Sequence, residues 1–135
     1  MEKGKGIKAI VSMIGLDGHN TGAEVVSKIL RDAGMEVVYL GNYQTPGMIL
    51  QAAVQEDVDI VGISSHASNY AQIEEVVRLL KEKKMNIPVI CGGTIPVTQV
   101  KNLKAKGIAE VFPPGTTSEA IVDFVVSAVK GSKAA

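Results

Sequence analysis

The chain has 135 residues, of which 46% are hydrophobic, and its 14 basic residues balance its 14 acidic ones. This length fits one domain with one hydrophobic core, and the balanced charge excludes electrostatic capture of nucleic acid or of an anionic membrane. The single cysteine excludes an intrachain disulfide, and the apolar runs are too short to span a membrane.

These properties predict a soluble cytoplasmic protein. We expect a single domain over residues 1–135, with frayed ends at residues 1–6 and 131–135. Short runs rich in β-branched residues alternate with longer segments of helical period, which is typical of βα units. The runs that predict strands are 7–14, 36–40, 59–64, 88–91 and 110–112. The segments that predict helices are 22–33, a helix from Pro46, 70–84, a helix from Pro96 and a helix that begins after Thr117 or Ser118.

Five such units joined by right-handed crossovers predict a flavodoxin-like (Rossmann-type) α/β fold, a doubly wound five-stranded parallel sheet with strand order 2-1-3-4-5. Helical spacing predicts inward-facing residues, among them Val25, Val26, Ile29 and Leu30 in the first helix and Ile49, Leu50, Ala53 and Val54 in the second. The fold does not identify a function, but such sheets bind ligands at the carboxyl ends of their strands. The loops expected at that edge are 15–22, 64–69, 92–95 and 113–117.

The loop after the first predicted strand contains Asp17 and His19, two residues apart. A neutral imidazole offers one nitrogen to a metal, and a carboxylate that accepts a hydrogen bond from the other nitrogen fixes the orientation of the ring. Without knowledge of a family, a polar turn at a strand end explains the same residues at least as well. Zinc is disfavoured because His19, His66 and Cys91 are the strong nitrogen or sulfur ligands available, without paired spacing. A single axial histidine beneath a macrocycle needs fewer protein ligands.

The run Asp17-Gly18-His19-Asn20-Thr21-Gly22 resembles the D-x-H-x-x-G signature of cobalamin-binding domains in mutases and methionine synthases. After the third and fourth predicted strands, Ser64-Ser65 resembles the start of the S-x-L element and Gly92-Gly93 resembles the G-G element of the same domains. The stretches 41–46 and 114–116 look like the cobalamin domain of methylmalonyl-CoA mutase. The resemblance covers nearly the whole chain, with its motifs in the family's order.

The resemblance implies that the chain binds adenosylcobalamin with the dimethylbenzimidazole base displaced from cobalt, and that His19 is the lower axial ligand. Asp17 would hold the other imidazole nitrogen, and the displaced nucleotide tail would occupy a slot between sheet and helices. Ser64 would hydrogen-bond the base, and Gly92 and Gly93 would allow close approach of the tail. The cofactor-binding residues implied in this way are Asp17, Gly18, His19, Asn20, Thr21, Gly22, Ser64, Ser65, His66, Gly92, Gly93 and Thr116.

Two positions depart from the family pattern. Methylmalonyl-CoA mutases typically have a lysine four residues before the motif aspartate, and this chain has Met13 there. The S-x-L element has leucine where this chain has His66, a residue that either contacts the tail or points to solvent. The first departure weakens the assignment of a subfamily more than the assignment of the cobalt ligand.

The resemblance further implies a role as the small subunit of an adenosylcobalamin-dependent acyl-CoA mutase. A large TIM-barrel subunit would bind the acyl-CoA, such as methylmalonyl-CoA or 2-hydroxyisobutyryl-CoA, so no catalytic residue is expected on this chain. The alternative is a corrinoid carrier, methyl-transfer or sensor domain without mutase activity. A receiver domain, which shares the fold, would need a phosphorylatable aspartate at the end of the third strand, where this chain has Ser64-Ser65.

Overall fold

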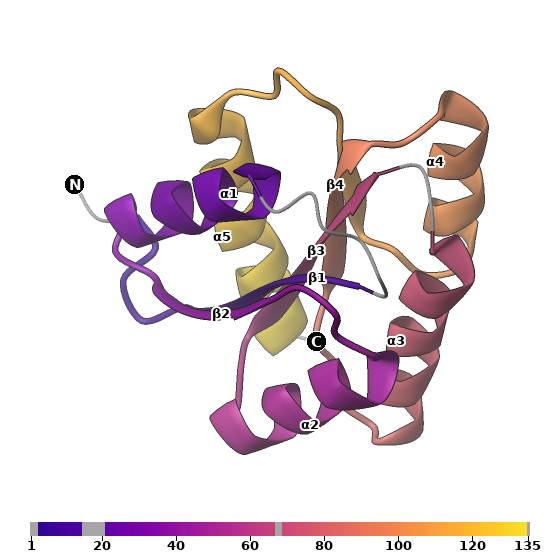
Figure 1. The fold of residues 1–135 in the computed structure, drawn as a ribbon. Helices are drawn as coiled ribbons and strands as arrows, with labels where there is room; N and C mark the ends of the chain where they lie inside the picture. Colours follow the sequence, from indigo (N-terminus) through magenta and orange to yellow (C-terminus); the bar gives the residue numbers. More distant parts are fainter. Residues whose placement is uncertain (1–2, 15–20, 67–68, 135) are drawn as a thin grey trace.

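Five strands and five helices alternate along the residues that the computed structural model describes, namely 3–14, 21–66 and 69–134 (Figure 1). The strands are β1 (Lys8–Met13), β2 (Glu36–Gly41), β3 (Ile60–His66), β4 (Val89–Thr94) and β5 (Glu110–Phe112). The helices are α1 (Thr21–Asp32), α2 (Pro46–Glu56), α3 (Tyr70–Glu82), α4 (Val97–Ala105) and α5 (Ser118–Ala134). Each predicted element is therefore present, with bounds that differ by a few residues.

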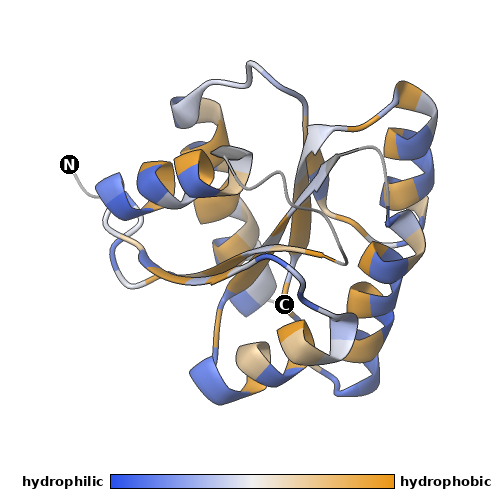
Figure 2. Cartoon of the chain, viewed as in Figure 1, coloured by the Kyte–Doolittle hydropathy of each residue, from blue (hydrophilic) through white to orange (hydrophobic). Residues whose placement is uncertain are grey.

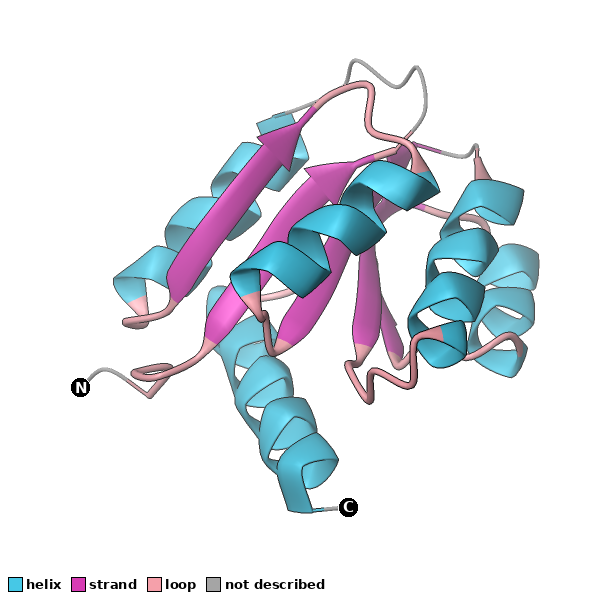
Figure 3. Ribbon diagram, turned by 90° about the horizontal axis from the view of Figure 1, so that it is seen from below, coloured by secondary structure: helices cyan, strands magenta, loops and turns pink. Residues whose placement is uncertain are grey.

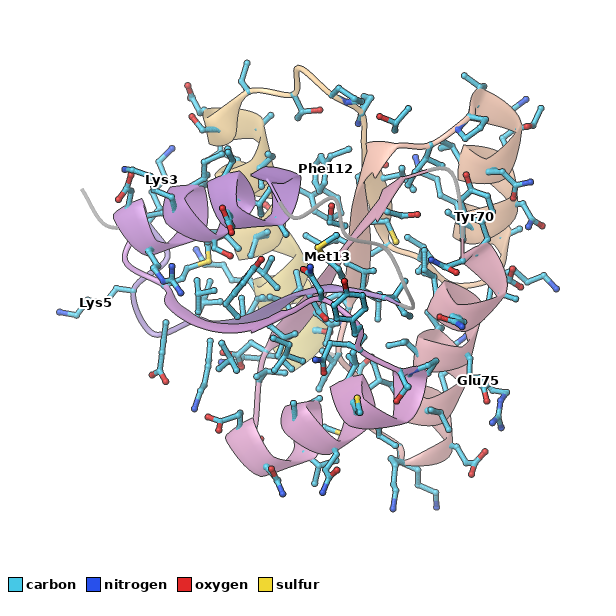
Figure 4. All side chains as sticks on the ribbon, viewed as in Figure 1. Lys3, Lys5, Met13, Tyr70, Glu75 and Phe112 are labelled. Carbon is cyan, nitrogen blue, oxygen red and sulfur yellow. The ribbon has the colours of Figure 1, made fainter. Side chains whose placement is uncertain are left out.

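The strands form one parallel sheet in the order β2-β1-β3-β4-β5, which confirms the predicted topology. Because all strands run in the same direction, their carboxyl ends meet at one edge of the sheet (Figure 3). The pairing aligns residues of four strands in a row at that edge. This row consists of Met13, Ser64, Gly92 and Phe112, of which Met13 and Phe112 are labelled in Figure 4.

Helices cover both faces of the sheet, with α1 and α5 on one face and α2, α3 and α4 on the other (Figure 1). Side chains alternate between the faces along each strand, and the helices turn their apolar sides inward (Figure 2). The core against α2, α3 and α4 includes Val61, Ile63 and Cys91. No helix within the described part of the chain has the length and apolar character needed to cross a bilayer.

Local signals set the ends of the helices. The Thr45 hydroxyl accepts a hydrogen bond from the Met48 backbone N–H at 3.1 Å, and Pro46 follows as the first helical residue of α2. Pro96 caps α4 instead of opening it, so that helix begins one residue later than predicted. The inward prediction for Val54 is wrong, because its side chain is 50% exposed while the neighbouring Ala53 is buried.

The expected frayed ends make specific contacts where the structure describes them. The Gly4 backbone N–H donates to the Ala33 carbonyl at 2.8 Å, next to the end of α1. At the other end, α5 continues to Ala134, and the Ser132 hydroxyl donates to the Asn86 carbonyl at 2.9 Å. These contacts join residues at both ends of the described chain to the rest of the domain, and the fraying expected at residues 1–6 and 131–135 stays a prediction. Residues 1–2 and 135 lie outside the described residues.

Candidate functional site

A cavity of about 410 Å³ lies between the sheet and the helices α1 and α5, and it reaches the carboxyl edge of the strands. Small residues on β3 and β4 leave this space open, because Gly62, Ser64 and Gly92 occupy positions that face α1 and α5. On the opposite face, Val61 and Ile63 at the neighbouring positions of β3 belong to the core against α2, α3 and α4. The cavity volume falls within the ~300–1,000 Å³ that is typical of small-molecule sites.

Glycine is not demanded by the fold at three positions that line the cavity, since none of them has a positive φ. A Cβ built on Gly22 would lie 3.7 Å from the Ser64 hydroxyl oxygen, and one on Gly92 would lie 3.6 Å from the Phe112 carbonyl oxygen. A Cβ on Gly62 would come no closer than 3.5 Å to any atom of its surroundings. These are ordinary van der Waals distances, so the surrounding backbone does not require glycine at these positions. The absence of a side chain at each of them leaves the cavity open.

Gly93 has a different role from its neighbour. Its φ is 116°, which residues with a side chain rarely adopt, and a Cβ there would overlap the Ser65 carbonyl oxygen on the paired strand. The fold itself therefore requires glycine at position 93. The sequence interpretation assigned both glycines to close approach of a ligand; the fold gives Gly93 a reason of its own, and for Gly92 the interpretation stays a prediction.

The loop from β5 to α5 closes one side of the cavity with a tight turn. The Thr116 backbone N–H donates to the Pro113 carbonyl at 3.2 Å, and its hydroxyl donates to the same oxygen at 2.6 Å. Pro114 and Gly115, with φ of 88° at the glycine, occupy the central positions that these residues favour in turns. The turn holds Thr116 against the cavity, with the lone pairs of its hydroxyl still able to accept a hydrogen bond.

The cavity is apolar in its interior and uncharged. Its aliphatic lining comes from the helices and the sheet, and no charged side chain among the described residues lines it. Polar side chains are contributed by Ser64, Thr94 and Thr116, near the carboxyl ends of the strands. Burial raises the pKa of the Cys91 thiol to about 12, so this lining residue is a neutral core residue, as its position in the sequence suggested.

Of the predicted site residues, Gly22, Ser64, Gly92, Gly93 and Thr116 line this cavity. Ser65 is buried and is not among the residues that line the cavity. The backbone of His66 pairs with Thr94 at the end of β3, and Thr21 begins α1. Asp17, Gly18, His19 and Asn20 lie outside the described residues. Within residues 3–14, 21–66 and 69–134, no group of three or more potential metal ligands occurs.

Sequence reasoning assigned none of the apolar lining to a site and did not single out one glycine of the central strand. Val25 was expected to face inward, yet it is 53% exposed, and it is among the residues that line the cavity. Gly62 was not singled out, although a glycine in the interior of a central strand often marks close approach of a ligand. The remaining aliphatic lining includes Val26, Ile29, Ile90, Ile121 and Val125.

Residues 7–122 match the protein family described as the B12 binding domain. The chain is 37% identical over 129 residues to the pivalyl-CoA mutase small subunit of Xanthobacter autotrophicus, covering 95% of this chain and 87% of that protein. It is 36% identical over 125 residues to the 2-hydroxyisobutanoyl-CoA mutase small subunit of Aquincola tertiaricarbonis, covering 91% and 92%. The methylmalonyl-CoA mutase of Cereibacter sphaeroides is 33% identical over 134 residues, which are 98% of this chain and 19% of that protein.

Solved structures agree on the fold. A cobalamin-binding protein from Desulfitobacterium hafniense has a TM-score of 0.78 and 23% identity, covering 92% of this chain and 59% of that one. The receiver domain of a Francisella response regulator has a TM-score of 0.71 and 13% identity, covering 93% and 98%. At these identities the likeness shows the doubly wound architecture alone, which both kinds of protein share.

Proposed function

Because this chain belongs to the B12-binding domain family, we propose that it is the cobalamin-binding small subunit of an adenosylcobalamin-dependent acyl-CoA mutase. The similarity that supports this role extends over nearly the full length of two mutase small subunits. The single structural observation that carries the proposal is the cavity beneath α1 and α5, which brings the residues of three separate family motifs together. These residues are Gly22, Ser64 and Gly92.

The cavity fits the displaced nucleotide tail of cobalamin. An aromatic base is largely apolar and suits the aliphatic interior, whereas the sugar and phosphate need water or hydrogen-bond partners. The polar residues Ser64 and Thr116 lie near the carboxyl edge, where those groups would enter. The uncharged lining agrees with this arrangement, since it leaves the phosphate at the mouth, close to the first N–H groups of α1.

The described residues that precede and follow the motif histidine in the sequence lie near the same side chain. Met13 ends β1 and pairs with Ser64, and a Cβ built on Gly22 would lie 3.7 Å from the Ser64 hydroxyl oxygen. His19 lies between Met13 and Gly22 in the sequence, outside the described residues. We propose that His19 is the lower axial ligand of the cobalt and that Asp17 orients its imidazole, as in the family motif.

This chain supplies binding and orientation, and its partner supplies the substrate site. When bound, adenosylcobalamin supplies a cobalt–carbon bond whose homolytic cleavage starts the carbon-skeleton rearrangement. The chain holds the tail in the cavity, which fixes the corrin at the carboxyl edge of the sheet. A large subunit with a TIM barrel would cover that edge, bind the acyl-CoA and exclude water.

Titration with hydroxocobalamin tests the binding role, with the visible spectrum as the readout. We expect wild type to bind with a spectral change that reports replacement of the lower base. His19→Ala should bind at least tenfold more weakly and lack this change, whereas His66→Ala, the matched control for a second histidine near the site, should keep it. Equal affinity and equal spectra for wild type and His19→Ala would refute the ligand assignment.

Activity tests the mutase role. The chain, loaded with adenosylcobalamin, is mixed with its cognate large subunit and a panel of branched and dicarboxylic acyl-CoA esters, and the isomers are separated by mass spectrometry coupled to chromatography. Rearrangement should require both subunits. If cofactor binds but no ester is rearranged with any cognate large subunit, the carrier or sensor role replaces the mutase role.

A further inference from the structure

The cavity extends along the sheet, away from the carboxyl edge, into a second row of paired residues. Ser64 belongs to the row at the edge, and Gly62 lies two residues earlier on the same face of β3. Two residues of a strand span about 7 Å. Gly62 pairs with Val11 on β1 and Ile90 on β4, and all three residues line the cavity.

Glycine at position 62 is unfavourable for the strand that contains it. A glycine in a strand interior costs roughly 0.5–1 kcal/mol relative to alanine, because more backbone freedom is lost on folding. The backbone does not require glycine at position 62, because its φ is not positive. Close neighbours do not require it either, since a Cβ there would lie 3.5 Å from the Ile10 carbonyl oxygen and 3.6 Å from the Ile90 Cγ1 atom. A side chain at position 62 would project into the cavity.

We infer that Gly62 is a specificity-determining residue that sets which lower base of a corrinoid the cavity admits. The inference rests on the proposed function. A fused two-ring base whose near edge lies at Ser64 extends with its far ring to the level of Gly62, between Val11 and Ile90. A single-ring base ends before that level. Glycine at position 62 therefore makes room for the second ring, and a side chain there would restrict the cavity to smaller bases.

Gly62→Val tests this inference against two corrinoids that differ in the lower base alone. One is hydroxocobalamin, with a dimethylbenzimidazole base, and the other is the phenolyl cobamide, with a single ring. Gly131→Ala is the matched control, because Gly131 lies in α5 with no atom within 4 Å of an added Cβ. Dissociation constants are measured by spectral titration, and urea unfolding of each variant without ligand measures its fold.

We expect Gly62→Val to fold at least as stably as wild type, since a β-branched residue suits a strand. Its dissociation constant for hydroxocobalamin should rise at least tenfold, while that for the phenolyl cobamide stays within threefold of wild type. Unchanged binding of hydroxocobalamin, or equal weakening for both corrinoids in a folded variant, would overturn the inference. Absence of hydroxocobalamin binding by wild type would instead overturn the proposed function, and the inference with it.

Discussion

Two adjacent glycines are predicted to respond in opposite ways to the same substitution. In Gly93→Ala, the new Cβ overlaps the Ser65 carbonyl oxygen, and the backbone stays at a φ of 116° or must rearrange. The backbone conformation costs about 1–3 kcal/mol for a residue with a side chain, and forcing strands β3 and β4 apart costs about 1–3 kcal/mol more. The expected loss is thus about 4 kcal/mol, a large part of the ~5–15 kcal/mol that stabilises a typical domain.

Gly92→Ala is the matched variant, because its Cβ meets only ordinary contacts, the nearest at 3.6 Å. It should change the free energy of unfolding by less than about 1 kcal/mol. Urea unfolding followed by far-ultraviolet circular dichroism measures both variants. With a slope of about 2 kcal/mol per M of urea, the Gly93→Ala midpoint should fall by about 2 M and that of Gly92→Ala by less than ~0.5 M. Equal midpoints would show that the tight approach of β3 to Gly93 is not what requires glycine there.

Three further predictions concern stability and reactivity. Burial raises the pKa of Cys91 to about 12, so the native protein keeps its thiol proton where the unfolded chain, with a pKa of about 8.5, loses it. The free energy of unfolding should therefore fall as pH rises above ~8.5, more steeply in wild type than in Cys91→Ala. The native thiol should react with a disulfide reagent only on unfolding, and rapid reaction in the native state would contradict its burial. Met13→Ala removes a side chain that is 0% exposed and should lower the free energy of unfolding by about 2–4 kcal/mol, whereas Met13→Leu should lower it by less than ~1.5 kcal/mol. Urea unfolding measures both variants, and similar losses for the two would contradict tight packing at this position. Ser132→Ala removes the hydrogen bond to the Asn86 carbonyl and should speed amide exchange in the last turn of α5, with exchange in β3 unchanged; an unchanged last turn would mean that this contact does not hold the end of the helix.

Much of the fold could be predicted because its signals are local and repeated. Alternating β-branched runs and amphipathic segments predicted each strand and helix, and right-handed crossovers then restricted the strand order. One error concerned the width of a helical stripe. Val54 was predicted to face inward, but it is exposed because it falls just outside the stripe that contains Ile49 and Ala53.

Site residues could be predicted where they belong to a sequence motif. The aliphatic residues that line the cavity belong to no motif and could not be predicted as part of a site. Ser64 and Gly92 were predicted because they resemble the S-x-L and G-G elements of cobalamin-binding domains, and both line the cavity. Gly62 was not found, since a single glycine within an apolar run shows its meaning only when pairing places it between Val11 and Ile90. The different roles of Gly92 and Gly93 likewise became visible only from the positions of the neighbouring strands, which carry the Phe112 and Ser65 carbonyl oxygens.

We propose that His19 replaces the cofactor's own base beneath the cobalt, with the displaced tail in the cavity beneath α1. Electron paramagnetic resonance tests it most directly, on protein loaded with hydroxocobalamin and reduced to the cobalt(II) state. Each line of the spectrum is split by the nucleus of the axial nitrogen. Protein labelled with ¹⁵N-histidine should convert the triplet splitting of ¹⁴N into a doublet, and His19→Ala should lack the doublet. A triplet that persists in the labelled protein would show that the cofactor's own base remains on cobalt, which would contradict the account.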